Sequence, residues 1–342
     1  MKNKEKGQLF FSMTYEFLEE YMPNRLGRSK STVKSYRDAL TVFRRYLYEE
    51  KGISIAKFRM ADCTKDLLLE FMGFLKSKGY TEGTCNQRAA AVKSYIWFVA
   101  DKDISVQSVA LAVSKVPQLK GPKKEKETLS DEALSAMLRQ PPNTKTGIRD
   151  RTIMVLLYDT AVRLDEILSL RLGDINLTGG MPYIHVHGKG NKERTVAVSE
   201  KTVSHLRNYI AACHPRQNKG DFLFYTRHNG EVGKMSEGNA ERFIRKYASA
   251  VRESGVPIPE NVYPHMFRRT RATNLYQQGV ELEMVSQILG HSTTETTKIY
   301  AKPSLDQMRR ALESVETPAQ DAEPPLWEQD SEEKMARLCG LR

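Results

Sequence analysis

Cysteine is scarce in this sequence of 342 residues. The chain has four cysteines, which are Cys63, Cys85, Cys213 and Cys339. No two of them form a C-x-x-C pair, so their spacing indicates neither a zinc site nor a disulfide framework. We therefore expect them to remain reduced thiols, as in a protein of the cytoplasm.

Long apolar runs and cofactor motifs are also missing. The richest apolar run, residues 153–158, is far shorter than the roughly 18 residues that predict a membrane-spanning helix. Only residues 9–11 are apolar after the basic N-terminus, so we expect no signal peptide. There is no P-loop and no carboxylate cluster suited to magnesium, so the sequence predicts no cofactor and no metal.

Positive charge, in contrast, is in excess. Lysine and arginine total 53 against 42 acidic residues, which gives a formal net charge of +11. This balance favours a polyanionic partner, because each phosphate that a protein neutralises releases counterions. Charge alone does not identify nucleic acid, since many enzymes are basic. The apolar fraction of 40% is that of a globular protein, and the length suffices for two domains.

Apolar spacing and composition divide the chain into four segments. Residues 1–114 repeat apolar positions three and four apart without a strand pattern, which predicts a small helical bundle. Residues 115–128, KVPQLKGPKKEKET, contain two prolines and five lysines and predict a basic interdomain linker. Residues 129–316 predict a mixed, mostly helical domain, and residues 317–342 an acidic, flexible tail. The fold class is therefore mainly α with a small antiparallel sheet in the second domain.

Local signals place several element boundaries. Ser29 or Ser31, Thr64 and Ser130 precede helical patterns as N-caps. The stretch MPYIHVHGKGNKERTVAVS alternates on both sides of residues 188–191, so it predicts an antiparallel hairpin with Lys189 at its tip. A Gly-Lys-Gly turn by itself is most often only a turn.

Cationic donors gather around one tyrosine near the C-terminus. His265 and Arg268 lie three apart in a helical pattern and therefore share a face. His291 follows a glycine at a helix end, and Tyr300 comes nine residues later. A phenol among such donors suggests a nucleophile that attacks a phosphodiester.

A second candidate phosphate clamp lies more than 70 residues upstream of these groups. Arg163 can bind two phosphate oxygens at once through its planar guanidinium, and Glu166, one helical turn later, can orient it. An arginine and a glutamate at this spacing are usually only a surface ion pair. The interpretation therefore depends on the whole set of motifs.

The order R-x-x-E, G-K-G on a hairpin, H-x-x-R, G-H and a late tyrosine resembles the tyrosine recombinase family, also called the phage integrases. The resemblance covers nearly the whole chain and implies a SAM-like core-binding domain followed by a catalytic domain. It implies that Lys189 is the general acid for the 5′-hydroxyl and that Tyr300 forms a 3′-phosphotyrosine. The residues that it places at the scissile phosphate are Arg163, Lys189, His265, Arg268, His291 and Tyr300, with Glu166 in support.

The resemblance also implies partners. These are double-stranded DNA with paired recombination sites, a homotetramer formed by exchange of an amphipathic C-terminal helix at 304–315, and an accessory DNA-bending or directionality factor. We expect a cytoplasmic, nucleoid-associated protein without a membrane partner. Basic residues of the first domain and the linker are candidate DNA contacts, although such charges are often merely solvated. They are Lys30, Lys34, Arg37, Arg88, Lys93, Lys120, Lys123 and Lys124.

Two motifs depart from the family pattern. The family commonly has serine where this chain has Asp165, and Leu-Arg-His where this chain has Phe267, Arg268 and Arg269. Neither departure removes a catalytic group. Arg269 adds a cation to which the sequence assigns no role.

Several functions share this chemistry. A type IB topoisomerase or a hairpin telomere resolvase also forms a phosphotyrosine, and a DNA-binding regulator can keep the fold without activity. The compact size and basic linker favour a recombinase, and the intact residue set argues against an inactive regulator. Among recombinases, the acidic tail favours an integrase or transposase of a mobile element over a Xer-like chromosome or plasmid dimer resolvase.

Overall fold

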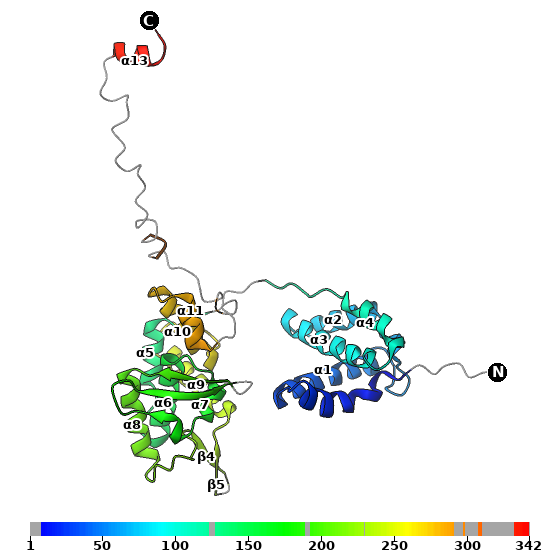
Figure 1. Cartoon of the computed structure of the whole chain (residues 1–342), viewed down its shortest axis with the longest axis horizontal. Helices are drawn as coiled ribbons and strands as arrows, with labels where there is room; N and C mark the ends of the chain where they lie inside the picture. Colours follow the sequence, from blue (N-terminus) through cyan, green and yellow to red (C-terminus); the bar gives the residue numbers. More distant parts are fainter. Residues whose placement is uncertain are drawn as a thin grey trace, which may run out of the picture. The chain divides into compact units, whose positions relative to one another are not determined.

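The computed structural model describes residues 8–122, 127–188, 192–228, 230–290, 297, 307–309 and 332–341. The chain divides into two compact units, Met1–Glu125 and Lys126–Arg342, each with its own apolar core (Figure 1). The prediction of a mainly α protein with antiparallel sheet is confirmed. Within the described residues, no helix combines the length and the apolar character that crossing a membrane requires.

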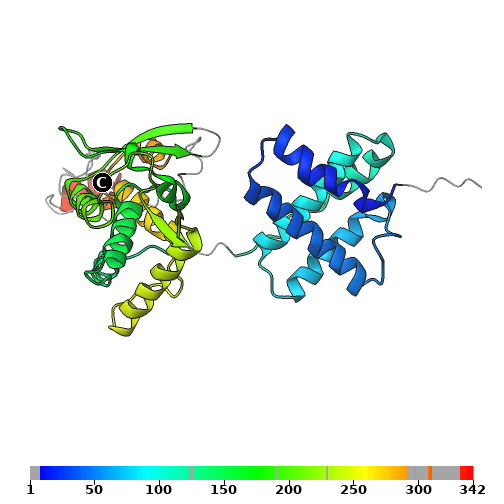
Figure 2. The same ribbon diagram turned by 90° about the horizontal axis from the view of Figure 1, so that it is seen from below.

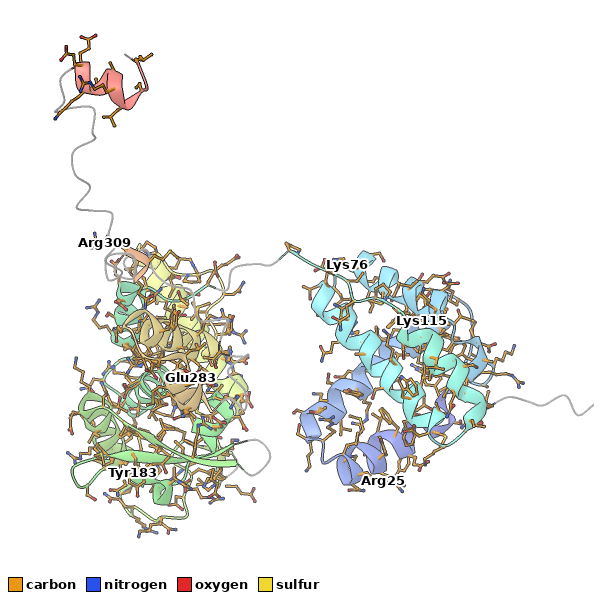
Figure 3. The ribbon with its side chains drawn as sticks, turned by 45° about the horizontal axis from the view of Figure 1, so that its top comes forward. Arg25, Lys76, Lys115, Tyr183, Glu283 and Arg309 are labelled. Atoms are coloured by element: carbon orange, nitrogen blue, oxygen red, sulfur yellow. The ribbon has the colours of Figure 1, made fainter. Side chains whose placement is uncertain are left out.

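Every named element in the described part of the N-terminal unit is a helix. Its elements are the 3₁₀ helix η1 (Phe10–Met13), the π-helix η2 (Glu16–Arg25), α1 (Lys30–Glu49), η3 (Met60–Asp62), α2 (Lys65–Ser77), α3 (Glu82–Ala100), η4 (Ile104–Val106) and α4 (Gln107–Ser114). Ser29, rather than Ser31, caps α1 by accepting a hydrogen bond from the Thr32 amide, and Thr64 caps α2 in the same way. Lys76, near the end of α2, and Lys115, after α4, lie on the surface of this unit (Figure 3).

The first helical segment of this unit is not a regular α-helix. The apolar spacing predicts only that this region is helical, and the structure has a short 3₁₀ turn followed by a π-helix. Pro23 lies inside the π-helix and has no N–H to donate, so a regular α ladder cannot pass through it.

An aromatic cluster holds the helices of this unit together. The rings of Phe10, Phe17, Phe43 and Tyr95 are buried, and neighbouring centroids lie 5.3–5.5 Å apart. The Tyr95 hydroxyl donates to the Phe10 carbonyl, so its polar end is satisfied within the core. Burial of these large side chains is what stabilises a bundle of this size.

The C-terminal unit combines helices with two small antiparallel sheets. Its helices are α5 (Asp131–Arg139), α6 (Lys145–Asp159), α7 (Leu164–Ser169), η5 (Leu172–Asp174), α8 (Glu200–Cys213), α9 (Glu237–Glu253), α10 (Pro264–Gln277), α11 (Leu282–Leu289) and α13 (Glu332–Leu338). The central α6 packs against α8 and α10. Ser130 caps α5, as predicted, and α13 lies in the predicted tail with no buried side chain.

The predicted hairpin is present. Strands β2 (Tyr183–Gly188) and β3 (Lys192–Ala197) pair in antiparallel register with Val186 opposite Arg194, and β1 (Ile175–Asn176) joins β2. Figure 2 shows this sheet along one side of the helices of its unit.

A second small antiparallel sheet, which the sequence did not predict, is also present. A second hairpin pairs β4 (Tyr225–His228) with β5 (Glu231–Lys234). Strands of four residues are too short to show a clear alternating pattern in sequence.

The two ends of the predicted linker are attached to their own units. On the N-terminal side, the Asn86 side chain exchanges two hydrogen bonds with the Leu119 backbone, at 2.9 and 3.0 Å. On the C-terminal side, Arg269 donates to the Glu127 carbonyl and the Leu129 amide donates to Thr270. The linker boundaries themselves, and Lys123 and Lys124 within them, stay a prediction, since residues 123–126 lie outside the described ranges.

Candidate active site

Arg163 and Glu166 meet at the start of α7. Arg163 is the N-cap residue, and its amide and its guanidinium both donate to the Glu166 carboxylate at 3.1 Å. Glu166 is at the third helical position, from which a carboxylate can reach back to the cap. The Arg163 side chain remains 44% exposed, so its outer edge faces solvent while its inner edge is fixed.

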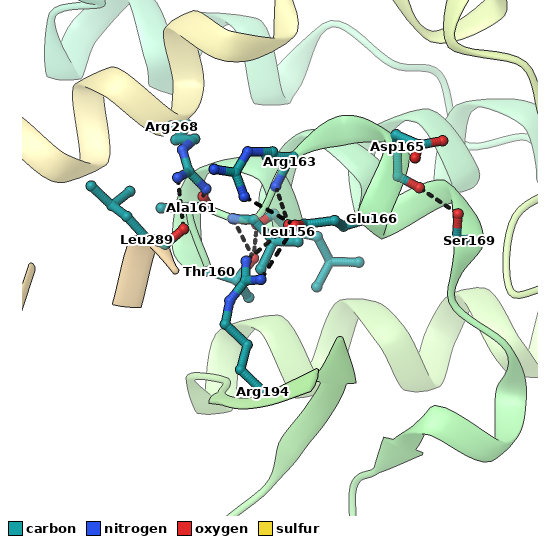
Figure 4. A network of polar contacts seen from close by, with 11 residues as sticks. Leu156, Thr160, Ala161, Arg163, Asp165, Glu166, Ser169, Arg194, Arg268 and Leu289 are labelled. Atoms are coloured by element: carbon teal, nitrogen blue, oxygen red, sulfur yellow. Dashed lines mark hydrogen bonds and ion pairs between the residues drawn. The ribbon is translucent and has the colours of Figure 1, made fainter. Parts of the chain in front are cut away.

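Arg194 of β3 binds the same carboxylate from the opposite side (Figure 4). Its two terminal nitrogens lie 2.8 and 3.3 Å from the Glu166 oxygens. Burial alone raises the pKa of Glu166, but the hydrogen bonds and charge of Arg194, with those of Arg163, outweigh it and leave that pKa below its ordinary value. Glu166 is therefore ionised at neutral pH.

Arg268, in contrast to Arg163, is fully buried. It belongs to α10, is 1% exposed, and donates to the carbonyls of Ala161 and Leu289 at 2.6 and 2.7 Å (Figure 4). The Ala161 backbone has a φ of +52°, which is uncommon for a residue with a side chain. These two carbonyls fix the guanidinium plane between α10, the start of α7 and the end of α11.

Gly290 closes the network at the end of α11. Its φ is +64°, the left-handed conformation that ends many helices. A side chain there would also clash, since an added Cβ would lie 2.8 Å from the Arg194 guanidinium. Glycine at this position therefore serves both the turn and the close approach of Arg194.

A pocket of about 310 Å³ brings three of the predicted residues together. Arg163, His265 and Arg268 all line it, although they come from α7 and α10, about 100 residues apart in the sequence. Asp165, Glu237 and Glu241 line it as well, and Asp165 is paired with the Lys234 ammonium. Two guanidinium groups and an exposed imidazole at one pocket can bind an anionic group such as a phosphate.

Comparisons with known proteins identify the family of this chain. Residues 127–306 match the model of the phage integrase family, and residues 16–103 match its N-terminal SAM-like domain. The chain belongs to the phage integrase family.

Similar proteins include tyrosine recombinase XerA of Pyrococcus furiosus, 28% identical over 87% of this chain and 93% of that protein. Tyrosine recombinase XerC of Staphylococcus carnosus is 30% identical over 82% of this chain and 90% of its own length. Among solved structures, the Tn1549 transposon integrase in complex with transposon right end DNA has the same fold, with a TM-score of 0.68 at 16% identity, over 89% of this chain and 99% of that one. The prediction that the chain is a tyrosine site-specific recombinase is confirmed.

The remaining catalytic predictions for this recombinase lie outside the described residues. These are Lys189, His291 and Tyr300, together with most of the predicted C-terminal helix at 304–315. Within that helix, Gln307 is described, and its side-chain amide donates to the Tyr276 carbonyl of α10 in the same chain at 2.7 Å.

The structure gives Arg269 a role that the sequence could not assign. Its guanidinium donates to the Glu127 carbonyl at 2.9 Å and to the Tyr263 hydroxyl at 3.0 Å. Arg269 therefore ties the first residues of the catalytic unit to α10 and supports the helix that carries His265 and Arg268. The other departure, Asp165, pairs with Lys234 of β5.

The candidate DNA contacts of the N-terminal unit differ in exposure. Lys30, Lys34 and Lys120 are exposed, whereas Arg37 is exposed but paired with Glu19.

Arg88 and Lys93 are only partly exposed. Arg88 stacks 4.0 Å from the centre of the Tyr80 ring, and Lys93 donates to the Val116 carbonyl at 2.7 Å. Whether any of the basic residues contacts DNA stays a prediction.

Proposed function

We propose that this recombinase cleaves DNA by attack of Tyr300 on a phosphodiester, which forms a 3′-phosphotyrosine and releases a 5′-hydroxyl. The observation that carries the proposal is the pocket at which Arg163, His265 and Arg268 converge, with Glu166 held beneath Arg163. These are the groups that must meet if one phosphate is to be bound and activated.

The chemical roles follow from charge and exposure. Arg163 is the accessible clamp for the non-bridging oxygens, and Arg268 is the buried one, fixed by two backbone carbonyls. His265 and His291 donate further hydrogen bonds as charge develops. Full ionisation of a free tyrosine at pH 7 costs roughly 4 kcal/mol, and neighbouring cations offset part of that cost.

Lys189 is the proposed general acid. A lysine ammonium is a compact proton donor, and the proton that it gives to the leaving 5′-oxygen balances the one that leaves the Tyr300 hydroxyl. The reverse reaction, attack of a 5′-hydroxyl on the phosphotyrosine, rejoins the strand. Because the covalent bond keeps the phosphodiester's energy, the proposed cycle uses neither ATP nor a metal.

The proposed partners are two double-stranded DNA sites held by a homotetramer, with an accessory bending or directionality factor on the same DNA. We propose that the C-terminal helix at 304–315 is exchanged between protomers. The contact of Gln307 with Tyr276 is one that this helix would have to break or repeat in a neighbour.

For the biological role we propose integration or transposition of a mobile element. One support is the acidic sequence that follows the family match, residues 307–342, which contains α13. The other is the fold that this chain shares with the Tn1549 transposon integrase. A Xer-like dimer resolvase is the second candidate, because XerA and XerC match this chain over at least 90% of their lengths. Inverted repeats that flank the gene favour the first role, and a single chromosomal site that the protein recombines favours the second.

A nicked DNA duplex tests the proposal. The duplex is enriched from a random library by binding to the full chain and then nicked near the centre, so that cleavage releases a short fragment and traps the adduct. We expect a covalent protein–DNA adduct with the wild type and none with Tyr300→Phe, at equal binding. Tight binding without any adduct from the wild type would instead identify a DNA-binding regulator.

Plasmid relaxation separates the recombinase from a topoisomerase. The recombinase is expected to act only on plasmids that carry the enriched site. Relaxation of a plasmid without that site would favour a topoisomerase.

A further inference from the structure

The outer face of the β2–β3 hairpin carries a cluster that the proposed chemistry does not use. His185 and His187 are two residues apart on β2, so they point to the same side of the sheet. On β3, Glu193 pairs with His187 and Thr195 pairs with His185. The intervening pair, Val186 and Arg194, points to the other side, where Arg194 meets Glu166.

The donor atoms of this cluster are spaced like the ligands of one metal ion. His187 Nδ1 lies 3.1 Å from Glu193 Oε1, and His185 Nε2 lies 3.3 Å from Glu193 Oε2. One donor atom of each of these three side chains lies within 4.8 Å of the other two. Tetrahedral zinc ligands with bonds of about 2.0–2.2 Å are separated by roughly 3.3–3.6 Å, so small side-chain rotations suffice.

Each histidine also has a second partner on its other ring nitrogen. His187 Nε2 lies 3.4 Å from Asp174 Oδ1, and His185 Nδ1 lies 3.3 Å from Thr195 Oγ1. Asp174 is itself fixed, because its other oxygen accepts the Arg171 amide at 2.7 Å. Metal-binding histidines usually donate their second N–H to such an acceptor, which sets the tautomer and orients the ring.

We propose that His185, His187 and Glu193 bind a divalent transition-metal ion of the zinc type, with Asp174 orienting His187. Two imidazoles and one carboxylate suit zinc, copper or nickel, whereas magnesium prefers an all-oxygen shell. The three side chains are 37–50% exposed, so an ion can enter from solvent and a water can fill the fourth position.

The bound ion would cross-link β2 and β3 on the face opposite Arg194. It is not a catalytic metal, and the proposal does not depend on the proposed recombination chemistry. Metal binding and DNA cleavage can therefore fail or succeed separately.

Titration calorimetry of the full chain, stripped of metal with a chelator, tests the site. We expect one Zn²⁺ to bind and to raise the unfolding temperature. His187→Gln and Glu193→Gln should each lower the affinity at least about 100-fold, and Asp174→Asn about 10–100-fold, as expected for a residue that orients a ligand. The matched control is His205→Gln, which changes a half-buried histidine of α8 and should bind zinc like the wild type.

Two further measurements separate this site from other zinc ligands. Cobalt bound in place of zinc should show no thiolate charge-transfer absorption, because no cysteine is in the proposed site. Circular dichroism should show that each variant is folded.

The proposal is overturned in either of two cases. The first is that no saturable zinc binding is seen, in which case the cluster is only a hydrogen-bonded group. The second is that folded His187→Gln and Glu193→Gln bind zinc as the wild type does.

Discussion

Glu166 is the residue on which the two arginine contacts of the site converge. Its carboxylate is 6% exposed and binds Arg163 on one side and Arg194 on the other. Removing one member of such a buried group lowers the free energy of unfolding far more than losing a surface ion pair does, because the remaining charges stay buried without a partner. We therefore propose that Glu166 acts on catalysis through Arg163, whose guanidinium it binds, and not by touching the DNA.

We predict that Glu166→Gln destabilises the catalytic unit by about 2–3 kcal/mol at pH 7. The pKa of Glu166 is lower in the folded state than in the unfolded chain, so its stabilising effect is present above the unfolded pKa. The effect is lost as the pH falls through the folded pKa. Calorimetric unfolding of both proteins at several pH values should therefore show a difference at neutral pH that shrinks below about pH 4.5. A difference that does not depend on pH would contradict the assignment.

At the scale of elements, the site is the place where the β2–β3 hairpin, α7 and the end of α11 meet. Arg194 connects the hairpin to α7 through Glu166, and Gly290 lets the end of α11 approach the Arg194 guanidinium. The hairpin, the first arginine motif and the glycine before His291 are thus coupled by packing. A change in one of these elements is expected to displace the others.

Gly290→Ala tests this coupling. The left-handed backbone alone costs an alanine about 1–2 kcal/mol, and the contact with Arg194 should add to it. Gly279→Ala is the matched control, because Gly279 also has a positive φ, +89°, but nothing lies within 4 Å of its added Cβ. We expect Gly290→Ala to be the more destabilising by at least about 1 kcal/mol.

A second variant separates the two contributions in Gly290→Ala. When Arg194→Ala is added, the extra cost of Gly290→Ala over Gly279→Ala should largely disappear. If Gly290→Ala destabilises the protein equally with and without the Arg194 side chain, the contact between residue 290 and Arg194 does not contribute to the loss of stability.

The sequence predicted those parts of the structure that depend on neighbouring residues. Ser29, Thr64 and Ser130 could be recognised as caps because a helix start is a local signal. Arg194 was missed because its partner Glu166 lies 28 residues away. Its signal was still present, since Arg194 lies two residues before Val196 and therefore shares the inward face of the strand with it. The His185–Glu193 cluster was missed for the same reason, because only the hairpin register brings these side chains together.

At the scale of the whole molecule, the net charge of +11 is divided between two units that are predicted to bind DNA together. Exposure distinguishes the cations that can serve this purpose. Lys34 is exposed beside a cavity of about 290 Å³ between α1 and α3, which Arg88 also lines. Lys93 is partly buried, and burial lowers its pKa.

We predict that Lys34→Ala weakens DNA binding. It should also lower the slope of log Kd against log salt concentration by about 1, the change expected when one phosphate contact is lost. Lys93→Ala should leave that slope unchanged and lower the unfolding temperature, because the Val116 carbonyl loses its partner. Fluorescence anisotropy over a series of salt concentrations measures the slopes. A larger change of slope for Lys93→Ala than for Lys34→Ala would contradict the prediction that Lys34, and not Lys93, contacts the DNA.

The chemistry of the covalent bond is the most direct test of the account. Trypsin should release Tyr300 on a peptide of residues 299–309, which contains no other tyrosine, because Pro303 protects the bond after Lys302. Mass spectrometry of the digested protein–DNA adduct is expected to find this peptide linked to a 3′-phosphate, with a free 5′-hydroxyl on the released strand. Linkage to any other residue, or to a 5′-phosphate, would contradict the assignment of Tyr300.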